Sequence, residues 1–280
     1  MTDLGKLTFA TTEKILCELM HSAIERIRLQ RLTFTTFSKQ NSYKPNVPDI
    51  FTSADQEAQE IYLKGIEECF PEWGIIGEEN ELRKPSQNGV WITLDPVDGT
   101  RAYARKQSSG VGSMIAVMAQ NRIIMAYVGD VMTQDIYGFR EDIPEGRLWL
   151  DFRQQYPLHY TEKELNQSTL LIATRLEQYP EPVKKIIRKF KSYQTNWDGI
   201  GMRFSKLWSG EVNALLFNFK HFTPWDAFPI LGISEHLGYR FYIWDLEKQK
   251  MVPFSVKLEM EPYPLQQDIF VLHESFYSRL

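Results

Sequence analysis

The spacing of apolar residues predicts two helices near the start of the chain. Between residues 15 and 27 apolar positions recur at helical spacing, with charged residues on the opposite side, which is typical of a helix that packs on a core. Residues 31–48 lose this period and end in a segment with prolines and an asparagine, so we expect an exposed loop there. Ser53, with Gln56 three positions later, forms a capping-box pattern, which predicts a second helix that ends at Pro71.

Further along the chain, short apolar runs predict strands and longer periodic runs predict helices. Residues 111–117 and 123–128 are expected to pair as an antiparallel hairpin that turns near Asn121. The other expected strands lie at 75–76, 90–94, near 136, and at 170–174, 213–219, 239–243 and 269–272, and the other expected helices at 182–190, 202–208 and 225–237. Alternating strands and helices favour an α/β organisation for the second half.

A polar, periodless stretch at 140–168 is the best candidate for a boundary between subdomains. We therefore expect an N-terminal α+β subdomain at residues 1–150, which carries most of the candidate site residues described below. A C-terminal α/β subdomain is expected at residues 151–280.

Composition narrows the class of protein. The 280 residues are 43% hydrophobic and 24% charged, which is typical of a folded globular protein with a substantial core. A net charge of −4 gives no general basic field, so a nucleic acid polymer is not an expected partner. No stretch reads as a membrane span or a signal peptide, so we expect a cytoplasmic location and no membrane partner. Cys17 and Cys69 lack metal-ligand spacing and are expected to be reduced core residues.

Candidate chemistry begins where the apolar run at 90–94 ends. Asp95 follows the run, Pro96 turns the backbone out of the strand, and Gly99 permits a tight turn after a second carboxylate at Asp98. Two carboxylates this close repel and raise each other's pKa, so a fold that keeps both ionised usually supplies a cation. From these residues alone, an ordinary Asp-Pro and Asp-Gly surface turn is the alternative.

Four acidic elements together resemble the inositol monophosphatase family of lithium-sensitive, magnesium-dependent phosphatases. The family's DxxTxxD, GEE, DPxDGT and WD motifs are matched in the same order by residues 49–55, 77–79, 95–100 and 225–226. Each motif alone is weak, but the four in order extend over most of the chain. The resemblance implies an α/β (α+β) fold, the layered αβαβα sandwich of the inositol monophosphatase and fructose-1,6-bisphosphatase type.

The resemblance also implies a set of ligands for Mg²⁺. A first ion would be held by Glu78, Asp95 and the backbone carbonyl of Val97. A second ion would be held by Asp95, Asp98 and Asp226. Independently of the family, all of these groups are oxygen donors and no His or Cys cluster accompanies them, which suits Mg²⁺ and disfavours zinc.

The family further implies direct attack by water on a small phosphate monoester, without a covalent intermediate. Thr100, oriented by Asp49 and assisted by Glu79, would position and activate that water. The phosphate would lie against the metal ions and the backbone amides near Gly99, where a glycine allows close approach. The residues expected to contact the substrate are Asp98, Gly99, Thr100, Gly201 and Asp226.

Several of these residues have structural alternatives. Asp55 reads more readily as a first-turn acid favoured by the helix dipole than as a catalytic group. Asp226 follows Pro224 and could likewise be a first-turn acid, and Glu79 could lie behind the metal ligands or be exposed. Cationic side chains that could approach a substrate anion, with solvated surface as the simpler alternative, are Lys44, Lys220 and His221.

The sequence departs from the family's pattern around the expected substrate. Inositol-preferring relatives usually carry an acidic residue seven positions before the late Asp, where this chain has Phe219 by ungapped counting. An apolar side chain cannot accept hydrogen bonds from sugar hydroxyls, so inositol phosphate is in doubt as the substrate. The pocket element that usually contains Gly-Ser/Thr is Gly199-Ile200-Gly201 here, and Ala227-Phe228-Pro229 replaces the usual Ala-Gly pair.

These departures do not affect the expected metal ligands. We therefore expect an active phosphatase whose substrate differs from the inositol phosphate of its relatives. Histidinol phosphate, a sugar phosphate and a 3'(2'),5'-bisphosphate nucleotide are the candidates. Family members commonly form homodimers, so a homodimer is possible. The rival from another class is a non-catalytic member that binds a partner protein or a phosphate ligand.

Overall fold

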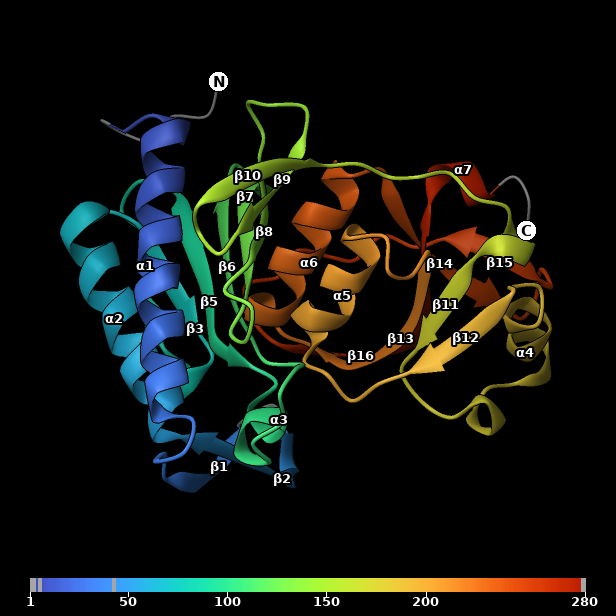
Figure 1. Ribbon diagram of the computed structural model, residues 1–280, viewed down its shortest axis with the longest axis horizontal. Coiled ribbons are helices and arrows are strands. Elements are labelled where there is room, and N and C mark those ends of the chain that lie inside the picture. Colours follow the sequence, from blue (N-terminus) through green and yellow to red (C-terminus); the bar gives the residue numbers. More distant parts are fainter. Residues whose placement is uncertain (1–3, 5–6, 42–43, 278–280) are drawn as a thin grey trace.

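Five layers of helix and sheet follow one another along the long axis of the molecule (Figure 1). The computed structural model describes residues 4, 7–41 and 44–277, and of residues 41, 44–48, 219 and 277 it describes the backbone alone. An eight-stranded and a six-stranded sheet alternate with three layers of helices. This arrangement confirms the layered αβαβα sandwich that the motifs imply.

The helices differ widely in length, and the longest form the outer layer beside the eight-stranded sheet. The α-helices are α1 (Phe9–Gln30), α2 (Ser53–Cys69), α3 (Thr100–Ala104), α4 (Glu181–Ile187), α5 (Ile200–Trp208), α6 (Pro224–His236) and α7 (Glu274–Tyr277). Short 3-10 helices occupy Glu79–Glu81, Leu165–Gln167 and Leu176–Gln178.

The two large sheets are mixed, and a separate hairpin precedes them. In spatial order, the eight-stranded sheet contains β10 (Gln154–Leu158), β9 (Gly146–Leu150), β8 (Ile136–Arg140), β7 (Arg122–Asp130), β6 (Gly112–Ala119), β5 (Val90–Asp98), β3 (Gly74–Gly77) and β4 (Arg83–Lys84). The six-stranded sheet contains β12 (Ser192–Thr195), β11 (Thr169–Ile172), β13 (Ala214–Phe222), β16 (Tyr263–His273), β14 (Tyr239–Asp245) and β15 (Lys250–Pro253). The hairpin pairs β1 (Thr36–Asn41) with β2 (Lys44–Thr52).

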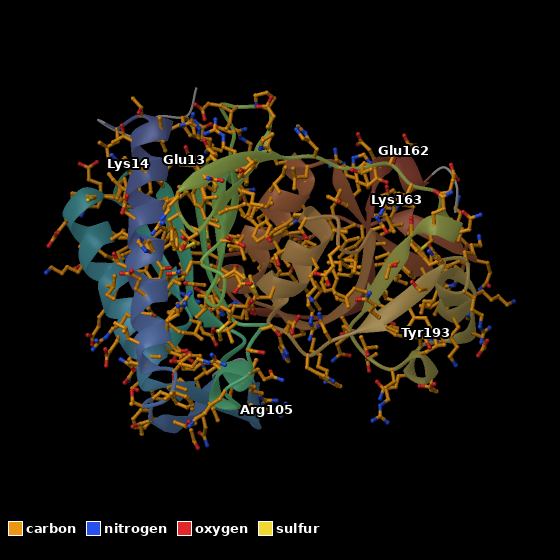
Figure 2. The ribbon with its side chains drawn as sticks, viewed as in Figure 1. Glu13, Lys14, Arg105, Glu162, Lys163 and Tyr193 are labelled. Carbon is orange, nitrogen blue, oxygen red and sulfur yellow. The ribbon has the colours of Figure 1, made fainter. Side chains whose placement is uncertain are left out.

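The outer helices α1 and α2 cover one face of the eight-stranded sheet. Leu16, Met20 and Ile24 of α1 are fully buried and belong to one hydrophobic cluster with residues of α2, β5, β6 and β7. Figure 2 labels Glu13 near the start of α1. The Glu13 carboxylate lies 3.6 Å from guanidinium nitrogens of both Arg140 and Arg147. These contacts attach α1 to β8 and β9.

The middle layer, α5 and α6, lies between the two sheets. Ten of the 13 residues of α6 are buried, which is expected of a helix that is apolar on all sides because sheets cover two of its faces. Its side chains share a second hydrophobic cluster with β6, β7, β13 and β16. A third cluster joins the far face of the six-stranded sheet to α4 and α7. The first turns of α5 and α6 are thereby fixed beside the strand ends of the eight-stranded sheet.

Two predicted features near residue 50 are wrong in detail. Most of the loop expected at 31–48 belongs to the β1–β2 hairpin, whose register pairs Lys39 with Asp49. The N-cap of α2 is Thr52 rather than Ser53, because Asp55 accepts hydrogen bonds from both the backbone and the hydroxyl of Thr52. Ser53 instead donates to Gln30.

The stretch at 140–168 is also more ordered than its polarity indicates. It contains β9 and β10, which extend the eight-stranded sheet as its outermost strands. The change from one sheet to the other comes between Leu158 and Thr169. A division of the chain near residue 150 stays a prediction.

Two sequence expectations concern the chain's chemistry and location. Cys17 and Cys69 are both free thiols, as expected, but only Cys17 is partly buried and Cys69 is exposed. None of the helices in the described part of the chain is long and apolar enough to cross a membrane.

Candidate active site

The pairing of β3 with β5 places two carboxylates side by side. These strands run parallel, and Gly77 at the end of β3 is in register with Leu94 of β5. Glu78 and Asp95 are the next residues on each strand, and the Glu78 amide donates to the Leu94 carbonyl at 3.1 Å. The pairing therefore brings both acids to the same edge of the sheet, although they are 17 positions apart along the chain.

A register shift in β5 separates Asp95 from Asp98. The pairing of β5 with β6 is regular up to Asp95 and resumes at Asp98, with Pro96 between them. Asp95 accepts a hydrogen bond from the Val97 amide at 3.0 Å, which fixes the turn. The local kink directs both carboxylates of the sequence motif toward the site, as expected of a bulge beside a functional centre.

Asp98 is held by the first turn of α5. Its two oxygens accept hydrogen bonds from the amides of Ile200 and Gly201, both at 2.8 Å. A Cβ atom at Gly199 would lie 2.5 Å from the Asp98 carboxylate, so the approach requires a glycine at that position. The Gly199-Ile200-Gly201 element thus lies against a predicted metal ligand.

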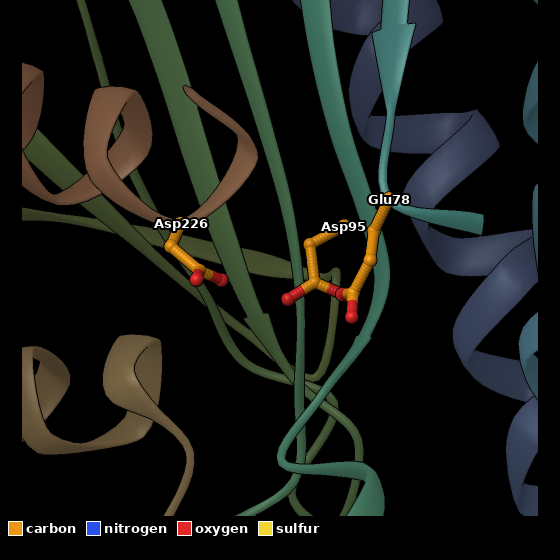
Figure 3. A group of neighbouring side chains, drawn as sticks. All are labelled: Glu78, Asp95 and Asp226. Atoms are coloured by element: carbon orange, nitrogen blue, oxygen red, sulfur yellow. The ribbon is translucent and has the colours of Figure 1, made fainter. Parts of the chain in front are cut away.

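Asp226 completes the carboxylate cluster from the first turn of α6. One carboxylate oxygen from each of Glu78, Asp95 and Asp226 lies within 4.8 Å of the other two (Figure 3). Thr223, the N-cap residue of α6, donates its hydroxyl hydrogen to Asp226. Three elements that are far apart in sequence therefore converge on one point.

Crowding of these carboxylates makes their ionised state costly. Burial raises the pKa of Asp95 well above its ordinary value, and the charges of Glu78, Asp98 and Asp226 raise it further. Burial and Asp226 raise the pKa of Asp98 to about 7, against the opposing effect of the two α5 amides. A cation among these groups would remove the repulsion and favour the ionised forms.

The turn at Gly99 brings Thr100 to the edge of the cluster. Gly99 has φ +85°, and a Cβ atom there would lie 2.5 Å from the Gly110 carbonyl oxygen, so both conformation and space require glycine. Thr100 starts α3, and its hydroxyl lies 3.1 Å from Asp55 Oδ1 and 3.0 Å from the Val97 carbonyl oxygen. The hydroxyl hydrogen is thus directed at one of these two acceptors.

The carboxylate that contacts Thr100 is Asp55, whereas the sequence analysis assigned that role to Asp49. Asp55 is buried, and one of its oxygens bonds Thr52 while the other accepts from Thr100. Burial raises the pKa of Asp55 to about 6, and the nearby charge of Glu78 adds to the effect. Asp49 lies on β2 opposite Lys39, and its carboxylate accepts from the Ile50 amide. Asp55 therefore combines a helix-capping contact with a contact to the site.

Lys39 is a residue of the site that the sequence analysis missed. Its Nζ lies 2.8 Å from Glu78 Oε1 and 2.7 Å from Glu79 Oε1. Burial lowers the pKa of Lys39, but the two glutamates outweigh burial and leave it above its ordinary value. Burial and Glu78 raise the pKa of Glu79 to about 8, in spite of Lys39. Only the unrecognised β1–β2 hairpin brings Lys39 here, so no local motif indicated it.

The structure describes the remaining candidate residues to different extents. The Val97 carbonyl faces Thr100 and keeps a second lone pair for another partner. Lys220 is exposed on β13. The side chains of Lys44 and Phe219 lie outside the described part of the structure, so the expectations for them stay predictions.

The donor set fits a hard divalent cation. Glu78, Asp95 and Asp226 bring three carboxylate oxygens together. Asp98 and the Val97 carbonyl, the other two ligands that the motifs imply, are oxygen donors as well. Mg²⁺ prefers such oxygen ligands and uses few protein carboxylates together with substrate phosphate.

Comparison with known proteins agrees with this geometry. The profile of the inositol monophosphatase family matches residues 10–235. The chain belongs to the inositol monophosphatase family. It is accordingly a phosphatase, a phosphoric monoester hydrolase.

Individual relatives are similar over most of the chain. A histidinol-phosphatase of Chlorobaculum parvum is 34% identical over 191 residues, which cover 67% of this chain and 70% of the relative. An inositol-1-monophosphatase of Bacillus subtilis is 25% identical over 191 residues, covering 65% of this chain and 68% of the relative. A solved IMPase structure of Thermotoga maritima has a TM-score of 0.72 over 96% of this chain and 94% of that one, at 12% identity. Because the sequence identity to this last structure is low, the similarity shows a shared fold only.

Proposed function

We propose that this family member is a Mg²⁺-dependent phosphomonoesterase that hydrolyses a small phosphate monoester by direct attack of water. The single observation that carries the proposal is the convergence of Glu78, Asp95 and Asp226 within 4.8 Å of one another. Such a group of close carboxylates, of which Asp95 is buried and the other two are partly buried, is expected to bind a divalent cation. Mg²⁺ sites typically add substrate phosphate as a further ligand.

The chain's residues divide into metal-holding and water-positioning groups. Glu78, Asp95 and the Val97 carbonyl would hold a first ion, while Asp95 together with Asp98 and Asp226 would hold a second, so that Asp95 is shared. The bound ions would supply Lewis acidity that activates water and stabilises charge on the phosphate and the leaving oxygen.

Thr100 and Asp55 would orient the attacking water. Because the Thr100 hydroxyl hydrogen is directed at Asp55 or the Val97 carbonyl, a lone pair of its oxygen is left to accept a hydrogen bond from water. A water held this way can be aligned with the phosphorus–oxygen bond that breaks. Glu79, fixed by Lys39 at 2.7 Å, is the second candidate to accept the proton. The phosphate would lie against the amides near Gly99.

A second candidate function is histidinol-phosphate hydrolysis. The observation that favours it is the 34% identity to the relative named histidinol-phosphatase, which exceeds the 25% identity to the inositol-1-monophosphatase. A 3'(2'),5'-bisphosphate nucleotide is a third candidate substrate from the sequence departures at Gly199-Ile200-Gly201 and Phe219.

The test is phosphate release from a panel of monoesters, with Mg²⁺, with EDTA, and with Mg²⁺ plus Li⁺. The panel contains inositol 1-phosphate, histidinol phosphate, a sugar phosphate, adenosine 3',5'-bisphosphate and p-nitrophenyl phosphate. We expect magnesium-dependent, lithium-inhibited release, with the natural class as the best substrate. A chain that binds Mg²⁺ but releases phosphate from none of these compounds would instead be the partner-binding member of the family.

A further inference from the structure

A cavity of about 560 Å³ lies between α4 and the hairpin of β14 and β15, at the opposite end of the molecule from α1 (Figure 1). The helix and the turn after it line the cavity with Pro182, Lys185 and Lys189, and the hairpin lines it with Trp244 and Lys250. This volume is within the usual range of pockets that take small organic ligands. The six-stranded sheet separates the cavity from α5 and α6, because α4 packs on the other face of that sheet. The cavity is therefore distinct from the carboxylate cluster.

The inner wall of the cavity is apolar, and two rings contribute to it. Ile186 and Met251 are nearly fully buried and belong to the hydrophobic cluster beneath α4. Pro182 and Trp244 also line the cavity, but they are only partly buried. The apolar side chains that a ligand would meet are thus two rigid rings, of which the indole suits a planar group that stacks on it.

The indole N–H of Trp244 lacks a hydrogen-bond partner. Its Nε1 atom is buried, and no acceptor in the described part of the chain bonds it. Buried polar groups are nearly always satisfied in folded proteins, and an indole N–H can only donate. The chain alone therefore leaves this donor without the acceptor that such a group normally has.

The charged side chains at the cavity are all cationic. Three lysines line it, and none of its described lining residues is acidic. Within the part of the chain that the structure describes, the ammonium groups of Lys185 and Lys250 make no hydrogen bond or ion pair. The neighbouring acids Glu181 and Asp245 are paired with other lysines, at 3.0 and 3.1 Å. The charge of Lys185 and Lys250 is thus available to an anion, and phosphate is a group that lysines commonly bind.

We propose that this cavity binds a nucleoside phosphate. The base would stack on the Trp244 indole, and the phosphate would bind the exposed ammonium groups of Lys185 and Lys250. Bare phosphate would leave the apolar wall uncovered, a nucleoside would leave the lysines without an anion, and an alkyl phosphate would not stack on the ring. Because the cavity lies on the other side of the six-stranded sheet, binding requires neither Mg²⁺ nor the proposed phosphatase activity.

The test measures binding by isothermal titration calorimetry, with EDTA present so that no phosphate is held through a metal ion. The probes are AMP, GMP, adenosine, ribose 5-phosphate and octyl phosphate. Adenosine lacks the anion, ribose 5-phosphate lacks the base, and octyl phosphate has an alkyl chain in place of the nucleoside. These three compounds separate the contributions of the two parts of the ligand.

Two kinds of variant address the two halves of the cavity. Trp244→Leu removes the ring, and Trp244→Phe keeps a ring without the N–H donor. Lys185→Gln/Lys250→Gln removes two charges from the cavity. Its matched control is Lys184→Gln/Lys248→Gln, which removes two charges from the same helix and hairpin but outside the cavity lining. The thermal unfolding midpoint of each variant shows whether it is folded.

We expect AMP and GMP to bind the wild type, and adenosine, ribose 5-phosphate and octyl phosphate to bind at least about tenfold more weakly. Trp244→Leu should weaken AMP binding roughly 5- to 100-fold, the usual contribution of a base stacked on an aromatic ring, and Trp244→Phe should weaken it less. Lys185→Gln/Lys250→Gln should weaken it roughly 3- to 30-fold. The matched control and Asp95→Asn should keep the wild-type affinity.

The inference fails if neither nucleotide binds, if ribose 5-phosphate or octyl phosphate binds as tightly as AMP, or if the lysine double variant and its control bind AMP equally. Loss of AMP binding in Asp95→Asn would place the nucleotide at the carboxylate cluster and would likewise contradict a second site. If Trp244→Leu does not fold, Trp244→Phe and the lysine double variant still decide the outcome.

Discussion

At the scale of single residues, the chemistry of the site could be predicted better than its hydrogen bonds. The spacing of Asp95 and Asp98 identified a pair of close carboxylates, and both are buried at one site. The motif at 49–55 contains two aspartates, and local sequence does not show which one faces β5. The position of Asp55 in the first turn of a helix indicates an acid favoured by the helix dipole, and in the structure the same carboxylate caps α2 and contacts Thr100.

Substitution of the two aspartates separates their roles. We expect Asp55→Asn to lower kcat by about 10²- to 10⁴-fold, the usual range for loss of a group that assists proton transfer, because Thr100 would lose its ionised acceptor. Asp49→Asn should lower kcat less than about tenfold. Steady-state kinetics with p-nitrophenyl phosphate provides the measurement. A larger loss of kcat in Asp49→Asn than in Asp55→Asn would show that Asp49, and not Asp55, orients Thr100.

The lowered pKa of His236 on α6 gives a prediction for how the unfolding free energy changes with pH. Burial lowers the pKa of His236 below its ordinary value of 6.5, and its ring packs on Phe139 at a centroid distance of 4.6 Å. The unfolded chain therefore takes up this proton at higher pH than the folded chain, and stability is lost as pH falls below about 6.5. Urea unfolding at pH 7.5 and 5.5 should show a larger loss of unfolding free energy for the wild type than for His236→Gln. Equal losses would show that His236 does not contribute.

At the scale of elements, buried strands and helices were predictable and edge strands were not. The residues of β6 are all buried, so its apolar run was plain in the sequence. In contrast, four of the five residues of β10 are exposed, because the strand is the outermost of its sheet. The prolines at 45 and 48 argued against a strand, but a two-stranded hairpin has only edges, where proline is tolerated. Lys39 was missed together with that hairpin.

The turn between β5 and α3 gives a prediction for stability. Gly99→Ala combines an unfavourable positive φ with a clash against the Gly110 carbonyl oxygen, so we expect a loss of about 2–4 kcal/mol in unfolding free energy. Gly210→Ala is the matched control, since Gly210 has φ +78° and nothing within 4 Å of an added Cβ. It should cost only about 1 kcal/mol. An equal loss of unfolding free energy in the two variants would mean that the backbone at Gly110 shifts to accommodate the added Cβ atom without a measurable loss of stability.

At the scale of the whole molecule, the order of four motifs was enough to predict the layered fold and the family. The site draws its residues from several layers. Asp55 lies on α2 in the outer layer, Glu78 and Asp95 lie at the ends of β3 and β5 in the eight-stranded sheet, and α5 and α6 lie between the two sheets. The sequence could not show that the α5 amides bind Asp98, because that contact joins residues more than 100 positions apart.

Mg²⁺ should stabilise the folded molecule as a whole. An ion that binds only the folded state adds about 2.7 kcal/mol at a concentration 100 times its dissociation constant. We expect a rise in the thermal unfolding midpoint of the wild type with MgCl₂, reversed by EDTA. Asp95→Asn should be folded and at least as stable without metal, because it removes like-charge repulsion, and should show a smaller rise. The same rise in both proteins would place the ion elsewhere.

The most direct test of the central claim is phosphate release by the wild type and Asp95→Asn, each with Mg²⁺ and with EDTA. Glu67→Gln serves as the control, because Glu67 is an exposed carboxylate paired with Lys84 on the surface. The account predicts turnover only for the wild type and the control, and only with Mg²⁺, while Asp95→Asn stays folded and inactive. Magnesium-dependent turnover by Asp95→Asn at the wild-type rate would contradict the assignment of this carboxylate cluster as the catalytic metal site.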